Sequence, residues 1–306
     1  MAKLVVATEK PFAPKAVEEI KAISEKAGYE FALLEKYTDK SQLLDAVKDA
    51  TALIIRSDKV TAEVIDAAKE LKIVVRAGAG YDNVDLEAAT ANQVTVMNTP
   101  GQNSNAVAEL ALGMMVFQAR GKFNGKAGTE LKEKTLGIHA YGNVGQNVAR
   151  IAKGFGMKVY AFDPFVDKNT VEQDGVTPLD TVEDLYKTCQ YISLHIPAND
   201  KTKGSIGKNL LGIMPKGATL VNTARKEVIH EEELAALMEE REDFVYLSDI
   251  APDNAEQLNE KYADRCYFTP KKMGAQTKEA NINAGIAAAQ QIVNFLEKGD
   301  ETFKVN

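Results

Sequence analysis

The sequence predicts an α/β protein with two doubly wound parallel sheets, each in a domain of its own. Three observations predict this fold class. Short apolar runs of strand length alternate with segments of helical spacing along nearly the whole chain. The 306 residues exceed the length at which one hydrophobic core usually keeps growing. A long helical segment at residues 103–120 divides the alternating elements into two series.

The first series occupies roughly the first hundred residues. Apolar runs predict strands at residues 3–8, 31–35, 52–56, 72–78 and 94–98. Helical spacing between them predicts helices at residues 13–27, 41–49, 61–70 and 85–92. Strands that alternate with helices in this way build parallel sheets, so we expect the first unit to close near residue 98.

The second series follows the 103–120 helix. Strands are predicted at residues 135–141, 158–163, 191–195, 218–222, 244–249 and 266–270. The chain ends in a long apolar-striped helix at 277–299, which could dock on either unit because no strand follows it. If this helix returns to the first unit, the chain leaves one domain, builds a second and returns, which makes two linkers and a cleft between the domains. Ligands of α/β proteins favour the cleft between such domains, at the carboxyl ends of the strands.

Composition excludes several classes of function. A net charge of −7 with 44 acidic residues argues against nucleic-acid or acidic-membrane partners. The start MAKLVVATEK lacks a basic segment followed by a long apolar one, and no apolar run approaches the length of a membrane span. Two cysteines, Cys189 and Cys266, form neither a disulfide framework nor a CxxC metal site, and only three histidines are present. We therefore expect a reduced cytoplasmic protein without a metal site.

The strongest local signal is LGIHAYGNVGQNVARIAKGFGMKVYAFDP, in which a strand leads through a glycine-containing loop into a helix. The spacing is that of a dinucleotide-binding GxGxxG loop, with Ala140 in the first glycine position. Gly142 would let the backbone approach a pyrophosphate, and Gly145 would allow close packing of helix on strand. Asn143 and Val144 at the helix start offer N–H groups and the positive end of the helix dipole. The competing interpretation is a packing turn that tolerates glycine.

Asp163 ends the next predicted strand, 18 residues after Gly145. A carboxylate at this place accepts hydrogen bonds from the ribose hydroxyls of the adenosine half of the cofactor. Pro164 and Phe165 follow it and supply no cation for a 2′-phosphate, so the sequence favours NAD over NADP.

Further motifs are spread along the chain: RAGAGYDNVD (76–85), NTPGQNSNAVAEL (98–110), LHIPANDKT (194–202), LVNTARKEVI (220–229) and GAQTKEA (274–280). With the nucleotide loop they identify the chain as similar to the D-isomer-specific 2-hydroxyacid dehydrogenases. The resemblance implies a Rossmann-like NAD-binding domain of residues 100–280, inserted into a flavodoxin-like substrate domain of residues 1–99 and 281–306. It also implies a homodimer that pairs through the cofactor domain, for which the apolar ALGMMVF (111–117) is a candidate surface unless that helix is simply buried. No regulatory domain follows residue 306, so no serine feedback through such a domain is expected.

The resemblance also implies roles for single residues. Arg225 matches the arginine that binds the 2-carboxylate of the substrate, for which a planar guanidinium is suited. Backbone N–H groups around Gly78 and Ala79 match the loop that holds the other face of that carboxylate. Asp249 matches the aspartate that fixes the nicotinamide amide, although a helix N-cap is an alternative. Further cofactor contacts are expected from His195, Pro197, Thr202, Thr223, Ala224, Gly274 and Ala275, whereas His139 and His230 are interpreted as structural.

The stretch FTPKKMGAQT (268–277) departs from the family, which has a catalytic histidine in Pro-His-x-Gly and a glutamate upstream. Here the histidine position holds Lys272, Lys271 stands where the proline would be, and the glutamate position holds Asn254 with Asp253 beside it. A lysine base must lower its pKa from about 10.4, which a close carboxylate would oppose and partial burial would promote. The two departures are therefore consistent with Lys272 as the acid/base. The alternatives are Lys271 in that role or a solvated lysine pair.

The resemblance implies NAD-dependent oxidation of D-3-phosphoglycerate. Candidates to bind its phosphate are Arg56, Ser57 and Asn103, with Lys59 or Lys271 as further possibilities, although Arg56 could be a plain strand-end arginine. Two other functions remain open: dehydrogenation of another D-2-hydroxyacid, such as glycerate or lactate, and NAD(H)-sensing by a non-catalytic binding protein of the same fold.

Overall fold

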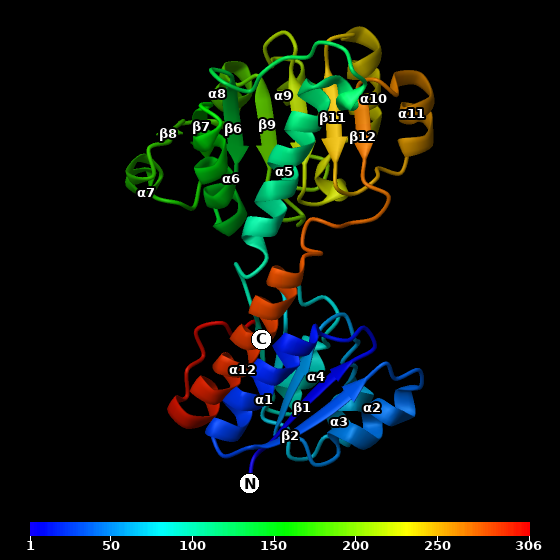
Figure 1. Cartoon of the computed structure of the whole chain (residues 1–306), viewed down its shortest axis with the longest axis vertical. Coiled ribbons are helices and arrows are strands. Elements are labelled where there is room, and N and C mark those ends of the chain that lie inside the picture. Colours follow the sequence, from blue (N-terminus) through cyan, green and yellow to red (C-terminus); the bar gives the residue numbers. More distant parts are fainter. The chain divides into compact units, whose positions relative to one another are not determined.

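The computed structural model describes all 306 residues and divides them into two compact units. Unit 1 contains Met1–Asn103 and Gln276–Asn306, and unit 2 contains Ser104–Ala275 (Figure 1). The chain thus passes between the units at 103/104 and 275/276, where the sequence suggested 99/100 and 280/281. The chain leaves unit 1 where α5 begins at Ser104 and returns shortly before α12 begins at Lys278.

Unit 1 is built on a parallel sheet with the strand order β2-β1-β3-β4-β5. The chain order reverses between β1 and β3, as in a doubly wound sheet. The strands are β1 (Lys3–Thr8), β2 (Glu30–Glu35), β3 (Ala52–Ile55), β4 (Ile73–Arg76) and β5 (Thr95–Asn98), and the connecting helices are α1 (Pro14–Lys26), α2 (Lys40–Val47), α3 (Ala62–Ala67) and α4 (Leu86–Ala91).

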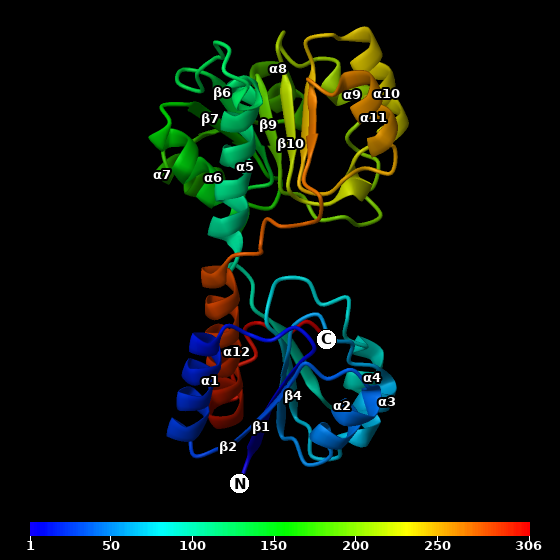
Figure 2. The same cartoon turned by 45° about the vertical axis from the view of Figure 1, so that its right-hand side comes forward.

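The last helix, α12 (Lys278–Lys298), belongs to unit 1 and lies beside α1 (Figure 2). Its small residues bring the two helices close: a Cβ on Gly285 would lie 3.0 Å from the Ile20 side chain and 3.1 Å from Phe12. Thr277 caps its start by accepting a hydrogen bond from the Ala280 N–H. Residue patterns alone left the docking of this helix open because no strand follows it, whereas the family resemblance placed residues 281–306 with residues 1–99.

Unit 2 contains a parallel sheet with the order β12-β11-β10-β9-β6-β7-β8. Its strands are β6 (Thr135–His139), β7 (Lys158–Phe162), β8 (Thr177–Pro178), β9 (Tyr191–Leu194), β10 (Thr219–Asn222), β11 (Val245–Ser248) and β12 (Cys266–Phe268). Its helices are α5 (Ser104–Ala119), η1 (Gly121–Phe123), α6 (Asn143–Gly154), α7 (Lys168–Gln173), α8 (Val182–Thr188), α9 (Lys208–Leu211), η2 (Lys226–Val228), α10 (Glu231–Glu240) and α11 (Ala255–Tyr262).

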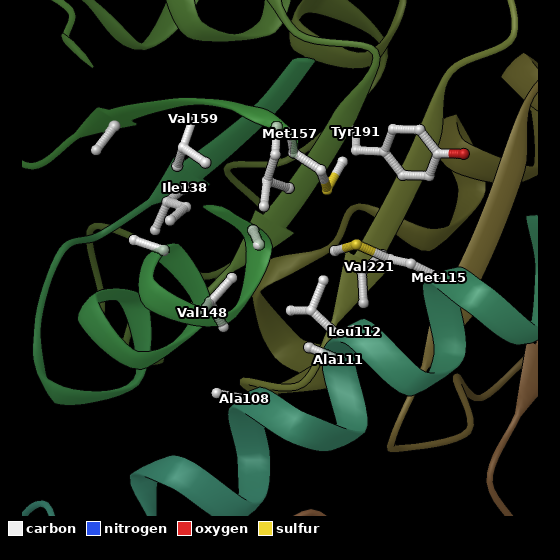
Figure 3. Packing of buried hydrophobic residues seen from close by; sticks show 14 of the residues in the cluster. Ala108, Ala111, Leu112, Met115, Ile138, Val148, Met157, Val159, Tyr191 and Val221 are labelled. Atoms are coloured by element: carbon white, nitrogen blue, oxygen red, sulfur yellow. The ribbon is translucent and has the colours of Figure 1, made fainter. Parts of the chain in front are cut away.

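Helix α5 packs across unit 2 rather than standing on its surface. Ala108, Ala111, Leu112 and Met115 are buried in one core with residues of the sheet and of α6, such as Ile138, Val148 and Val221 (Figure 3). Most of the ALGMMVF stretch is therefore used inside unit 2. The alternative of a helix buried in its own domain explains these residues without a second subunit.

No helix of the protein has both the length and the apolar composition that crossing a membrane requires.

Candidate active site

The predicted site residues of unit 2 follow the carboxyl ends of its strands. The parallel register aligns His139 with Leu194, Leu194 with Asn222, Asn222 with Ser248, and Ser248 with Phe268. Residues that follow these strands therefore lie along one edge of the sheet. The chain order reverses between β6 and β9, where ligands of open α/β sheets bind.

The loop after β6 differs from the predicted strand 135–141, since β6 ends at His139. Ala140 has a φ of +78°, which breaks the strand. Gly145 is required by packing, because a Cβ there would lie 2.4 Å from the Ala140 carbonyl oxygen. Gly142 is different: its φ is −79° and a Cβ would meet nothing within 4 Å. Nothing inside the protein requires glycine at 142, which fits close approach of an external group.

This loop has the features that a dinucleotide needs. Helix α6 starts at Asn143, and no side chain caps its first turn. The backbone N–H groups of this turn and the positive end of the helix dipole are therefore available to an anion. Asp163 follows β7 and accepts hydrogen bonds from the N–H groups of Tyr141 (2.8 Å) and Phe165 (2.8 Å). Its carboxylate is thereby fixed beside the loop, with lone pairs left for ribose hydroxyls. The residues present fit a dinucleotide.

Two histidines lie at this reversal point: His139 ends β6, and His195 directly follows the neighbouring β9. The Nδ1 of His139 lies 3.2 Å from the Tyr186 hydroxyl, and the Nε2 of His195 lies 2.9 Å from the Ser193 hydroxyl. Burial lowers the pKa of His139 to about 4, against an opposing effect of Asp163, and lowers the pKa of His195 to about 3. Both rings are therefore neutral at pH 7, which supports a positioning role rather than proton transfer.

These histidines predict acid sensitivity of folding. Their folded-state pKa values lie below the unfolded value of about 6.5, so the unfolded chain binds more protons. The stabilisation is present above pH 6.5 and is lost as the pH falls toward 4. The free energy of unfolding should decrease by up to about 1.4 kcal/mol per pH unit for each histidine in that window.

Denaturant unfolding between pH 5 and 7.5 measures this slope. His139→Gln should flatten it, because this variant removes one of the two histidines whose pKa is lowered by burial. An unaltered slope in His139→Gln would contradict the assignment.

The predicted cofactor residues after β9 form a short turn. The Thr202 hydroxyl donates to the Pro197 carbonyl oxygen and accepts from the Asn199 N–H at 2.9 Å. The hydroxyl of Thr202 is thus used to close the loop. A direct contact of Thr202 or Pro197 with the cofactor stays a prediction.

The segment Asn222–Arg225 follows β10. The Asn222 side chain accepts from the Ala224 N–H (3.0 Å) and donates to the Arg225 carbonyl oxygen (2.9 Å), which holds the turn. The Thr223 hydroxyl is buried and has no hydrogen-bond partner. The Arg225 side chain is exposed and donates a hydrogen bond to the Ala224 carbonyl oxygen. It forms no ion pair, so its guanidinium is available to a carboxylate.

Asp249 follows β11 and is 1% exposed. Its carboxylate accepts from the Thr269 hydroxyl (3.0 Å), the Met273 N–H (2.9 Å) and the Gly274 N–H (2.8 Å). It is not a helix N-cap, as the alternative interpretation held; it anchors the loop 269–274. Gly274 has to be small, since a Cβ would lie 2.9 Å from an Asp249 oxygen. The contact of Asp249 with the nicotinamide amide, and those of Gly274 and Ala275 with the cofactor, stay predictions.

Lys271 and Lys272 lie on this anchored loop, and both are exposed. The partial burial that the sequence argument required of a lysine base is therefore not provided by the protein alone. Asp253 forms an ion pair with Lys226, so its charge is already compensated. Asn254 is held by α10 through Glu231, and its Oδ1 is buried without a partner.

In unit 1, Arg56 follows β3, but its guanidinium is already engaged. It donates to the carbonyl oxygens of Lys10 and Pro11, both at 3.1 Å, and to Asn281 Oδ1 at 2.5 Å. It also lies 5.2 Å from the ring centroid of Phe12. These contacts favour the plain structural interpretation of Arg56 that was the alternative. Ser57 and Lys59 beside it are exposed, and Asn103, the last residue before unit 2, is partly exposed.

The loop after β4 holds a residue that sequence reasoning missed. Arg76 lies across Gly78, where an added Cβ would be 1.6 Å from its Nη1, and its Nε donates to the Arg56 carbonyl. Gly78 has a φ of +149°, and Ala79 is exposed with its carbonyl bound by Asn98 at 2.6 Å. The signal was available, because Arg76 opens the RAGAGYDNVD motif from which Gly78 and Ala79 were selected.

Residues 106–270 match the family described as D-isomer specific 2-hydroxyacid dehydrogenase, NAD binding domain. The chain is 38% identical to D-3-phosphoglycerate dehydrogenase of Methanocaldococcus jannaschii over 84% of this chain and 52% of that protein. It is 37% identical to hydroxypyruvate reductase of Thermotoga maritima over 87% of this chain and 92% of that protein. The human D-3-phosphoglycerate dehydrogenase is 35% identical over 87% of this chain and 52% of that protein. The chain thus spans about half the length of the two phosphoglycerate dehydrogenases.

Solved structures agree with these matches. A 3-phosphoglycerate dehydrogenase of Entamoeba histolytica with bound NAD⁺ is similar with a TM-score of 0.86 and 48% identity, over 100% of this chain and 98% of that one. The TT0316 protein of Thermus thermophilus is similar with a TM-score of 0.78 and 27% identity, over 99% of this chain and 100% of that one. The glycine loop, the uncapped α6 and Asp163 lie within the matched region. The chain therefore belongs to the D-isomer specific 2-hydroxyacid dehydrogenase family, and its unit 2 contains the NAD-binding domain of that family.

Proposed function

We propose that this protein oxidises D-3-phosphoglycerate to 3-phosphohydroxypyruvate with NAD, the first step of serine biosynthesis. The observation that carries the proposal is a chain of hydrogen bonds in unit 2. The Asn222 side chain binds the Arg225 backbone, the Asn222 carbonyl accepts from the Asp249 N–H (3.0 Å), and the Asp249 carboxylate holds the loop of Lys272. This network thus holds both the backbone of Arg225, whose guanidinium has no ion pair, and the loop that carries Lys272. Relatives named for this activity support the substrate.

The proposed chemistry divides between these two side chains. Arg225 binds the 2-carboxylate of the substrate through two parallel hydrogen bonds, which fixes the 2-hydroxyl. Lys272, in its neutral form, takes the proton of that hydroxyl while the C2 hydrogen leaves as hydride. Bound NAD supplies the hydride acceptor. In the reverse direction, the Lys272 ammonium donates its proton to the keto oxygen.

A lysine that acts as a base has to lose its proton near neutral pH. Because Lys272 is exposed, the required desolvation has to come from the bound substrate and cofactor. A nearby cation such as Arg225 would lower the pKa further. Asn254 in place of the family's glutamate avoids a carboxylate that would raise it, and Asp253 is neutralised by Lys226.

The substrate phosphate requires a cation of its own. Arg56 uses its guanidinium within unit 1, so we assign it a supporting role and propose Arg76, whose guanidinium lies against Gly78, as a further phosphate candidate. Ser57, Asn103 and the exposed Lys59 remain polar candidates in the same unit. Backbone N–H groups at Gly78 and Ala79 are proposed for the carboxylate.

The decisive experiment follows NADH formation with 3-phosphoglycerate, D-glycerate and D-lactate side by side. The proposal expects the highest catalytic efficiency with 3-phosphoglycerate. A preference for D-glycerate would favour the second candidate, glycerate/hydroxypyruvate turnover, which the similarity to a hydroxypyruvate reductase over 92% of its length supports. Binding of NADH without turnover of any of the three would instead favour a NAD(H)-sensing protein.

We expect a strong preference for NAD over NADP. Asp163 is fixed by two backbone N–H groups beside the loop, and its negative charge would repel a 2′-phosphate. Steady-state kinetics with both cofactors at equal concentrations measure the preference. Asp163→Ala should reduce it, whereas comparable efficiency of the wild type with NADP would contradict the role of Asp163.

We also propose a homodimer that pairs through unit 2. Much of ALGMMVF is buried, but Phe117 remains partly exposed, and Phe123, which contacts it edge-on at 5.3 Å, is 67% exposed. Light scattering should give twice the 33.3 kDa of one chain at assay concentration. Phe123→Asp should shift the mass toward the monomer, and a wild-type mass of one chain would exclude the dimer.

A further inference from the structure

The loop that receives the pyrophosphate carries an alanine in an unfavourable conformation. Ala140, with its φ of +78°, lies in the left-handed region that glycine adopts freely and alanine does not. It occupies the position of the first glycine of a GxGxxG loop, the glycine that makes the tight turn. The surrounding contacts therefore have to hold Ala140 in place.

Hydrogen bonds fix the backbone on both sides of this alanine. The Ala140 N–H donates to the Phe162 carbonyl oxygen at 2.9 Å. The next N–H, that of Tyr141, donates to Asp163 at 2.8 Å. The Tyr141 carbonyl accepts from the Gln146 side chain at 3.2 Å. The peptide groups around Ala140 are thus tied to β7 and to α6.

The side chain of Tyr141 adds an anchor below the loop. It is 0% exposed and lies in the core with Ile138, Val148 and Val171. Its hydroxyl donates to the Asp174 carboxylate at 3.0 Å, and Asp174 is exposed at the end of α7. Lys153, near the end of α6, binds the Asp174 carbonyl oxygen. Asp174, which accepts the hydrogen bond of Tyr141, is thus also connected to the helix that follows the loop. Burial raises the pKa of Tyr141, which keeps the hydroxyl protonated as a donor.

We propose that Tyr141 is a positioning residue for NAD: its buried ring and its hydrogen bond to Asp174 hold Ala140 in the left-handed conformation and so keep Gly142 and the start of α6 in place for the pyrophosphate. In this chain the contacts of Tyr141 maintain a backbone conformation at residue 140 that a glycine would adopt without them. Without the anchor, Ala140 relaxes toward negative φ and the loop moves, and NAD binding has to restore it at a cost in affinity.

The test measures the NAD dissociation constant, by titration with NADH fluorescence, together with the thermal midpoint of unfolding. Tyr141→Phe keeps the ring and removes the hydroxyl; it should weaken NAD binding by roughly 3- to 10-fold, because part of the free energy of the hydrogen bond to the Asp174 carboxylate is lost from the loop. Asp174→Ala removes the acceptor from an exposed site and should have the same effect on affinity. Ala140→Gly in the Tyr141→Phe background should restore most of the loss, because glycine adopts the turn unaided.

Tyr37→Phe is the matched control, since this buried tyrosine of unit 1 also donates its hydroxyl to a carboxylate, that of Asp58, at 2.8 Å. It should leave NAD affinity unchanged. Two results would overturn the proposal: an unchanged dissociation constant in both Tyr141→Phe and Asp174→Ala, or a double variant Ala140→Gly/Tyr141→Phe that binds NAD as weakly as Tyr141→Phe alone. The second result would mean that the tyrosine stabilises the fold without controlling the turn.

Discussion

Lys272→Ala is expected to lower turnover by roughly 100- to 10,000-fold, the usual contribution of a positioned general acid or base. NAD affinity should change little, because the glycine loop and Asp163 hold the cofactor in another part of the sheet edge. Steady-state kinetics of oxidation and a NADH titration on the same protein separate the two effects.

Lys271→Ala is the matched control, because Lys271 is the adjacent exposed lysine of the same anchored loop. It should keep most of the turnover. If Lys271→Ala abolishes activity and Lys272→Ala does not, the assignment is displaced by one residue. If both variants stay active, the pair is solvated and neither lysine is the base.

Lys272→His tests whether the lysine at the family's histidine position and Asn254 at its glutamate position depend on each other. Alone it should recover little activity, because no carboxylate at 254 supports the imidazolium. Combined with Asn254→Glu it should recover more than the two single changes add up to. The acidic limb of the oxidation profile should then move to lower pH, since the base has to be deprotonated and histidine has the lower pKa.

Arg225→Leu is expected to reduce catalytic efficiency by roughly 100- to 1,000-fold, equivalent to about 2.7–4 kcal/mol, through loss of the carboxylate contact. The Arg225 side chain has no ion pair in the protein, so its removal leaves no acidic partner unpaired and should cost little stability. Arg225→Lys should recover only part of the activity, because an ammonium cannot bind both carboxylate oxygens as a planar fork does.

Arg120→Leu, an exposed arginine at the end of α5, serves as control and should leave the kinetics unchanged. An Arg225→Leu enzyme with an unaltered KM and kcat would exclude Arg225 as the carboxylate anchor. A loss of activity that follows the loss of thermal stability in this variant would contradict the proposed role as well.

Much of the fold could be predicted from residue patterns alone. The alternation of apolar runs and helical spacing located the strands of both sheets except the short edge strand β8, because a strand buried on both faces has to be apolar along its whole length. The loop around Gly142 and Gly145 and the carboxylate Asp163 could be read from spacing, since they lie within one strand–helix–strand unit. Arg225 and Lys272 were found from motifs of the family rather than from geometry.

Other features depend on contacts between residues far apart in the chain. Arg56 looked like a phosphate ligand, but its guanidinium is engaged by Asn281, 225 residues away. Asp249 was expected to contact the cofactor or to cap a helix; it caps no helix, and its carboxylate accepts hydrogen bonds from a loop that begins 20 residues later, while the cofactor contact stays a prediction. Sequence spacing could not show either contact, because a hydrogen bond is decided by distance and direction in the folded chain.

The sequence by itself determined the two α/β units, the place of the dinucleotide loop and the candidate guanidinium and lysine, since each follows from local pattern or motif. Only the tertiary structure decided that Lys272 is exposed and that Ala140 adopts a glycine-like turn. The physical reason is that these properties are set by burial and by hydrogen bonds from other elements. The same alanine that reads as a missing glycine in the sequence is held at φ +78° by Phe162, Asp163 and the buried Tyr141.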